Sequence, residues 1–286
     1  MTGGGAIHAI KLTITIVSTM LFGLILGGAA NADSMTPPKN AQIDFYFYRT
    51  KVPIKTTIGL TDPQSNRYVS KAITIPKNTV VAGHPTFVKD HRIKTIAIDA
   101  TALSYHIKKT ADRSGYFFEQ LQDFTGDIPY SKAKFITAKR PGYMPQASNG
   151  NLFAGTVPKS FPNAFQSNKL AVTTDGYVET YPYSSTRLPE GFLNRPAGVA
   201  KITKYQRRGQ KTFLYYHAHL KGVHDVRIKK TGKARYRLTI SGPNRMQTQT
   251  VWDGGKQAFV ANVYYHDYIV GNQKFYTEIG EKGIDS

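Results

Sequence analysis

Histidine is the residue type whose spacing in this sequence comes closest to a metal-binding pattern. His217 and His219 are separated by one residue in a strand-like segment, so their side chains project from one face. His224 and Asp225 follow, and an H-x-H pair with a carboxylate is compatible with zinc. No H-E-x-x-H motif accompanies them. A wall-acting hydrolase with these three histidines as metal ligands is one interpretation, and tyrosine-flanked histidines on an exposed strand face are the other.

Basic residues alternate with tyrosines around these histidines, over residues 204–237. Guanidinium and ammonium groups bind phosphate and carboxylate, and tyrosine rings stack on sugars or pack in a core. The pattern indicates either a surface that binds an anionic polymer or a solvated charged face above a tyrosine-rich core. The candidate polymer-binding residues are Lys204, Arg207, Arg208, Lys211, Lys229, Lys230, Lys233, Arg235 and Arg237, and the candidate aromatic contacts are Tyr205, Tyr215, Tyr216 and Tyr236. Arg235 and Arg237 are expected to share one strand face.

Other catalytic chemistry has little support in the sequence. The chain contains no cysteine, which excludes thiol catalysis and cysteine-ligated metals, and no serine lies in a G-x-S-x-G motif. Single carboxylates such as Asp99, Glu119 and Glu179 have two interpretations. They are turn or surface residues, or two of them form the catalytic pair of a glycosidase, which is defined by distance in the fold and not by sequence spacing. A non-catalytic protein without a cofactor is therefore favoured over an enzyme.

The N-terminus has the features of an export signal. Lys11 is followed by an apolar stretch over residues 12–28 and by Ala30-Asn31-Ala32, which predicts a signal peptide over residues 1–32 with cleavage before Asp33. The stretch is shorter than the ~20 apolar residues that a membrane span needs, so a retained anchor is the less favoured alternative. The protein is thus expected to be secreted and kept at the cell wall or outside the cell.

The charge balance points to an acidic partner. The chain has 38 Lys and Arg residues against 18 Asp and Glu, a formal net charge of +20, and only Lys11 of the basic residues lies in the predicted signal peptide. Such an excess attracts polyanions. Nucleic acid is the generic partner of a basic chain, but export argues against it. At a Gram-positive surface the candidates are teichoic acids, wall carboxylates and lipid head groups.

The elements that must position these residues are predicted to be strands. Residues 33–44 have the composition of a linker, with Pro37 and Pro38. Beyond them, short segments rich in Thr, Val, Ile and Tyr end at Gly, Pro, Asn or Asp, which predicts an all-β fold. One of these expected strands covers residues 103–109. Hairpin turns are expected at residues 175–176, 207–209, 229–233 and 253–255. A short connecting helix is predicted within residues 114–124, from the spacing of Tyr116, Phe117, Leu121 and Phe124.

A pair of similar segments suggests an internal duplication. The sequence YRTKVPIKTT (48–57) is followed by TIPKNTVVAG (74–83), and FITAKRPGYMP (135–145) is followed by TVPKSF (156–161). Pro76, Lys77 and Asn78 are interpreted as a turn, because proline presets φ and asparagine tolerates the left-handed region. A phosphate-binding loop would need several glycines and a following helix, and this segment has one glycine.

The segments YRTKVPIK, YVSKAITIPKNTVVAG and IKTIAIDATALSYHIKK resemble the small SH3-like β-modules of secreted, wall-associated proteins of lactic acid bacteria. The resemblance covers residues 45–112 and, less closely, 130–183. These segments lack the Gly-Trp dipeptide of teichoic-acid-binding modules, because the single tryptophan of the chain, Trp252, lies outside them. The resemblance implies association with a cell surface and assigns no ligand residue.

The sequence therefore predicts a surface protein built from β-modules. The expected division is a first SH3-like barrel or sandwich over 45–112, a helix with a second module over 113–186, and a C-terminal antiparallel unit with a basic face over 187–286. The expected function is non-catalytic binding of an anionic envelope polymer, teichoic acid or peptidoglycan. The alternatives are the metal-dependent hydrolase and an adhesin or structural surface component that contacts a surface glycan or another protein.

Overall fold

The computed structural model describes residues 46–283 except for 66, 90, 120–122, 147, 158–164, 188–190 and 254–257. The predicted signal peptide and linker lie outside the described residues. The fold is all-β, as predicted, with curled antiparallel sheets and one short helix in the described part of the chain. No helix among these residues has the length and apolar composition to cross a membrane.

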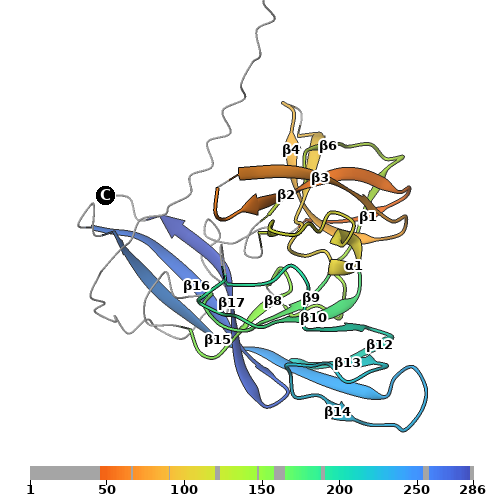
Figure 1. The fold of residues 1–286 in the computed structure, drawn as a ribbon, viewed down its shortest axis with the longest axis vertical. Coiled ribbons are helices and arrows are strands. Elements are labelled where there is room, and N and C mark those ends of the chain that lie inside the picture. Colours follow the sequence, from red (N-terminus) through yellow and green to blue (C-terminus); the bar gives the residue numbers. More distant parts are fainter. Residues whose placement is uncertain are drawn as a thin grey trace, which may run out of the picture.

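The N-terminal part consists of a five-stranded sheet and a hairpin (Figure 1). The sheet has the order β6-β5-β4-β1-β7 and comprises β1 (Tyr46–Thr50), β4 (Val80–Phe87), β5 (Ile93–Ile98), β6 (Ile128–Pro129) and β7 (Phe135–Thr137). The hairpin pairs β2 (Ile54–Asp62) with β3 (Arg67–Ile75). Apolar side chains of the hairpin and the sheet share one core, because Ile58 and Ile75 cluster with Val81, Ile96 and Ile98.

The second part is a ten-stranded antiparallel sheet with the order β11-β10-β9-β8-β17-β16-β15-β13-β12, in which β14 also pairs with β15. Its strands are β8 (Asn151–Ala154), β9 (Lys169–Val172), β10 (Tyr177–Tyr181), β11 (Gly198–Lys201), β12 (Lys204–Arg208), β13 (Lys211–Tyr216), β14 (Val226–Arg227), β15 (Tyr236–Asp253), β16 (Ala258–Val270) and β17 (Gln273–Gly283).

The two parts share a hydrophobic core and a polar contact. Phe47 and Ala82 of the five-stranded sheet cluster with Leu170, Val172 and Val178 of the ten-stranded sheet. The helix α1 (Tyr105–Lys108) joins them as well, because the Tyr105 N–H donates a 2.8 Å hydrogen bond to Glu179 Oε1 of β10. The ten-stranded sheet is thus held directly against the N-terminal part.

The predicted helix within residues 114–124 is wrong over the residues that are described there. Phe117 exchanges two 2.9 Å backbone hydrogen bonds with Thr61, and Phe124 forms a bridge with Asp99. Backbone pairing with distant strands therefore outweighs the local helical spacing of the aromatic residues. The expected strand over residues 103–109 is also wrong, because α1 lies there with its first turn bonded to the ten-stranded sheet.

The predicted turns that the structure describes are confirmed, while residues 254 and 255 of the turn expected at 253–255 lie outside the described residues. Asn78 has φ of 66° between β3 and β4, as expected for an asparagine in the left-handed region. Hairpins connect β9 to β10, β12 to β13, β14 to β15, and β15 to β16. The first two turns place Gly176 (φ 88°) and Gly209 (φ 57°) where a side chain would be strained.

The predicted division of the chain stays a prediction, and sheet pairing crosses its second boundary. Strand β10 lies before residue 187 and β11 after it, yet Val178 pairs with Ala200 across them. The two openings of the suggested duplication lie side by side, because Tyr48 of β1 pairs with Thr137 of β7. The strands that follow them differ, since β4 and β5 join the five-stranded sheet and β8 to β10 join the ten-stranded sheet.

Candidate functional site

The predicted binding residues lie at the end of the ten-stranded sheet formed by β12, β13 and β15. Directly paired residues of antiparallel strands project from the same face. One row runs across Lys204, Tyr215 and Arg237, and a parallel row pairs Arg208 with Lys211. We call the residues of this side that carry charge or an aromatic ring the basic face: Lys204, Arg208, Lys211, Phe213, Tyr215 and Arg237.

The opposite side of the same strands packs into the core. Leu214 pairs with Leu238, and both are fully buried. Tyr216 lies on this side with 0% of its surface exposed, so its predicted role as an aromatic contact is wrong. Its hydroxyl donates a 2.8 Å hydrogen bond to Asp225 Oδ2, and burial followed by this bond raises the pKa of the Tyr216 hydroxyl well above its usual value.

Three other predicted residues share that inner side by register. Tyr205 pairs with Leu214, Arg207 with Thr212, and Tyr236 with Tyr216. Tyr205 is nevertheless 46% exposed, because it lies at the outermost strand of the sheet. The predicted residues therefore divide between two sides of the sheet, and Tyr205 and Arg207 do not belong to the basic face.

Cations of the basic face lie over aromatic rings. The Lys204 Nζ is 5.7 Å from the centroid of Tyr215, and the Arg237 guanidinium carbon is 5.3 Å from the centroid of Phe213. The Tyr215 hydroxyl donates a 2.8 Å hydrogen bond to Gln206 Oε1, which fixes that ring. A cation over a ring keeps its charge and its outward N–H groups, so the arrangement presents positioned cations to an anion.

Backbone carbonyls organise the basic loop between β14 and β15. Arg227 donates from Nε to Lys229 O at 3.4 Å, and Arg235 donates from Nε to His217 O at 2.7 Å. The sequence predicts that Arg235 and Arg237 share one strand face. Arg235 precedes the first residue of β15, so only Arg237 belongs to that strand. The lysines of this loop have exposed side chains and extend the positive surface beyond the strands: Lys229, Lys230 and Lys233.

Two of the three candidate histidines contact polar groups of the protein. His219 Nδ1 is 2.6 Å from Asp225 Oδ1, and the side chain of Asp225 is 1% exposed while that of His219 is 60% exposed. Asp225 also accepts the Leu220 N–H at 2.9 Å. His217 Nδ1 lies 3.2 Å from the Gly232 carbonyl oxygen instead. Within the described residues no three His, Asp or Glu side chains are grouped as metal ligands, so a site formed with His224 is not found there.

The sequence reasoning missed a second group of basic residues. Arg49 and Lys139 line a cleft next to Tyr205, where the five-stranded sheet meets the ten-stranded sheet. Both belong to the segments 48–57 and 135–145 that the sequence singles out as similar. That similarity is the one signal that could have linked them, since ninety positions of sequence separate the two side chains.

Comparison with models of protein families, with curated proteins and with solved structures finds no match for this chain.

Proposed function

We propose that this protein is exported and binds an anionic polymer of the cell envelope, without catalysis, through the basic face and the lysines of the neighbouring loop. The observation that carries the proposal is the alternation of cations and aromatic rings on one open side of β12, β13 and β15. Teichoic acid and peptidoglycan carry the phosphate or carboxylate groups that such cations bind, and sugar rings that stack on tyrosine.

The charge of this region has no local compensation. Between residues 198 and 241 the sequence contains a single acidic residue, Asp225. Its carboxylate is turned inward and bonded to His219, Leu220 and Tyr216. The positive field around the basic face is therefore available to an external polyanion.

Two alternatives from the sequence have weaker support. The metal-dependent hydrolase needs a third ligand beside His217 and His219, and the described residues supply none. An adhesin or structural component that contacts a host glycan or another protein needs no excess of positive charge. Localisation outside the cell, with retention at the wall, is part of the proposal and rests on the export signal that the N-terminal sequence predicts.

The proposal is tested by retention of the purified protein on isolated cell walls, with and without teichoic acid, over a series of salt concentrations. Retention that falls as salt rises and on removal of the polymer is the expected result, because exposed charges are screened over ~10 Å at 0.1 M salt. Retention that survives both treatments indicates recognition of a neutral glycan or a protein. No retention at any salt concentration overturns the proposal.

A further inference from the structure

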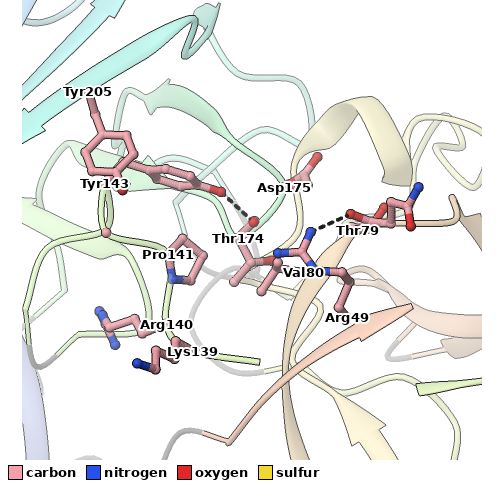
Figure 2. Close-up of a pocket in the computed structure, with 12 residues that line it drawn as sticks. Arg49, Thr79, Val80, Lys139, Arg140, Pro141, Tyr143, Thr174, Asp175 and Tyr205 are labelled. Carbon is pink, nitrogen blue, oxygen red and sulfur yellow. Dashed lines mark hydrogen bonds between the residues drawn. The ribbon is translucent and has the colours of Figure 1, made fainter. Parts of the chain in front are cut away.

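A cleft of about 440 Å³ lies at the junction of the two parts of the molecule. Five segments that are far apart in the sequence line it: β1, the turn before β4, the stretch after β7, the turn between β9 and β10, and β12. Figure 2 shows Arg49 on one side and Lys139, Arg140 and two tyrosines on the other. The volume is in the ~300–1,000 Å³ range of small-molecule sites.

The charge of the cleft is positive. Arg49 is exposed, and among the described residues its guanidinium makes one hydrogen bond, of 3.3 Å, to the Asn78 carbonyl oxygen. Lys139 is exposed and forms no hydrogen bond or ion pair with any residue that the structure describes. These two cations therefore keep donors for an incoming anion.

Two further charged residues of the lining are committed to the protein. The Arg140 guanidinium donates to the carbonyl oxygens of Pro145 and Ser148, and burial lowers its pKa to about 10, so it stays charged at neutral pH. Asp175 is the one acidic residue among the described residues of the lining, and Ser104 occupies both of its oxygens, at 3.0 and 2.5 Å. Three cations, Arg49, Lys139 and Arg140, stand against this one carboxylate, so the described lining has a formal excess of two positive charges.

A pair of tyrosines forms the other wall of the cleft. Tyr143 and Tyr205 meet edge to face with ring centroids 5.8 Å apart, and the Tyr143 hydroxyl donates a 2.6 Å hydrogen bond to the Thr174 carbonyl oxygen. Tyr205 lies directly on the backbone of Gly142, because a Cβ there would be 2.8 Å from its hydroxyl oxygen. The two rings are therefore held in place before any ligand arrives.

We propose that this cleft is a second binding site and takes a short anionic saccharide, one or two sugar units that carry a phosphate or carboxylate. Arg49 and Lys139 bind the anionic group, as Arg and Lys do in phosphate and carboxylate sites. Tyr143 and Tyr205 form the platform for the sugar ring, because an apolar ring face and a fixed aromatic surface are complementary.

The cleft and the basic face are separate sites. Tyr205 and Lys204 are adjacent in sequence, but alternation along β12 directs Tyr205 to the cleft and Lys204 to the basic face. The cleft can hold its ligand whether or not the basic face binds a polymer. Adjacent residues of one strand therefore supply a test residue and a matched control.

Calorimetric titration of the purified protein tests the proposal with four probes: glucose 1-phosphate, glucuronate, glucose and inorganic phosphate. We expect saturable binding of at least one anionic sugar below about 10 mM and much weaker binding of glucose and of phosphate alone. Comparison of glucose 1-phosphate with glucuronate shows whether the cleft prefers a phosphorylated or a carboxylated sugar. Glucose or inorganic phosphate binding as tightly as both anionic sugars overturns the proposal, and so does the absence of saturable binding.

Variants assign the binding to the cleft. Arg49→Gln and Tyr205→Ala are each expected to raise the Kd for the anionic sugar about tenfold. Lys204→Gln, the control on the opposite side of β12, should leave the Kd within about twofold. Thermal unfolding of each variant shows that it is folded. An unchanged Kd in folded Arg49→Gln contradicts the proposal. Retention of the same variant on cell walls tests the basic face independently, so failure of the cleft proposal can be told apart from failure of the proposed function.

Discussion

The two ends of the ten-stranded sheet carry their charges in opposite ways. At the β10 end, Glu179 is 1% exposed and the Lys108 side chain of α1 is 3% exposed. Asp99 and Asp123 are buried in the same region and interact electrostatically with Lys108. At the β12 end, Lys204, Arg208 and Lys211 are exposed to solvent.

This difference separates charges that hold the fold from charges that are available to a partner. Glu179 accepts the Tyr105 N–H at 2.8 Å and the Tyr181 O–H at 2.7 Å, so its carboxylate ties α1 to the sheet. Burial raises the pKa of Glu179 and lowers the pKa of Lys108, since both charges are removed from water. The exposed cations of the β12 end have no such internal duty.

Removal of a buried charge at the β10 end is expected to have the largest effect. Glu179→Ala leaves the Tyr105 N–H and the Tyr181 hydroxyl without their acceptor and removes a carboxylate near Lys108. The free energy of unfolding should fall by about 3–5 kcal/mol, as for other broken buried charge networks. Chemical denaturation measures this, with Glu179→Gln as the milder control that keeps one acceptor oxygen. A loss below about 1 kcal/mol in Glu179→Ala would contradict the assigned role.

The free energy of unfolding should depend on pH through a carboxyl group of the same region, Asp123. Burial, reinforced by Glu119, raises the pKa of Asp123 to about 7, above the ~4 of an unfolded aspartate. The folded state therefore holds this proton more tightly, and the stabilisation present below pH ~4 is lost as the pH rises through about 7. Between pH 5 and pH 7 we expect the titration of Asp123 alone to lower the unfolding free energy by about 2 kcal/mol.

Asp123→Asn is the matched variant for this pH dependence, because it cannot titrate. The fall between pH 5 and pH 7 should be smaller in the variant than in the wild type. It should not vanish, because burial and Glu281 also raise the pKa of Glu278 to about 7. An identical pH profile for Asp123→Asn and wild type would show that Asp123 does not titrate in this range.

A single cation of the basic face should have an intermediate effect, on binding. Arg237→Gln removes the guanidinium that lies over Phe213, and we expect affinity for isolated walls to fall about threefold to tenfold at low salt. Sedimentation of the protein with walls measures the affinity. Arg67→Gln, an exposed arginine of the N-terminal hairpin, is the charge-matched control. An equal loss in both variants would mean that total charge, and not the basic face, governs retention.

Stability should respond least to the exposed cations. Lys204→Gln is expected to change the unfolding free energy by less than about 0.5 kcal/mol, because its cation lies at the surface over Tyr215. Denaturant titration of this variant measures the change. A loss comparable to that of Glu179→Ala would remove the distinction between the two ends of the sheet.

The fold class and the turns could be predicted from local sequence. Short segments rich in β-branched and aromatic residues indicated strands, and Asn78 and Gly209 indicated turns that the structure contains. The helix prediction within 114–124 failed because the partners of Phe117 and Phe124 are Thr61 and Asp99, which no local pattern reveals.

The site residues were only partly predictable for the same reason. Clustering of cations near 204–237 is local and visible, but Tyr215 and Tyr216 look alike in sequence, and only strand register shows which one is buried. Asp99 and Glu179 had a surface or turn interpretation, yet both are buried by contacts between distant segments. The cleft depends on Arg49, Lys139 and Tyr205 meeting in space, which requires the assembled sheets.

The most direct test of the account is the salt dependence of wall binding in a variant with Lys204, Arg208, Lys211 and Arg237 all changed to Gln. Its control changes four exposed lysines of the N-terminal part to Gln: Lys55, Lys89, Lys94 and Lys109. Both variants have the same net charge. The account predicts weak binding with a shallow salt dependence in the first variant and nearly wild-type binding in the control. Equal retention and equal salt dependence in the two variants would contradict it.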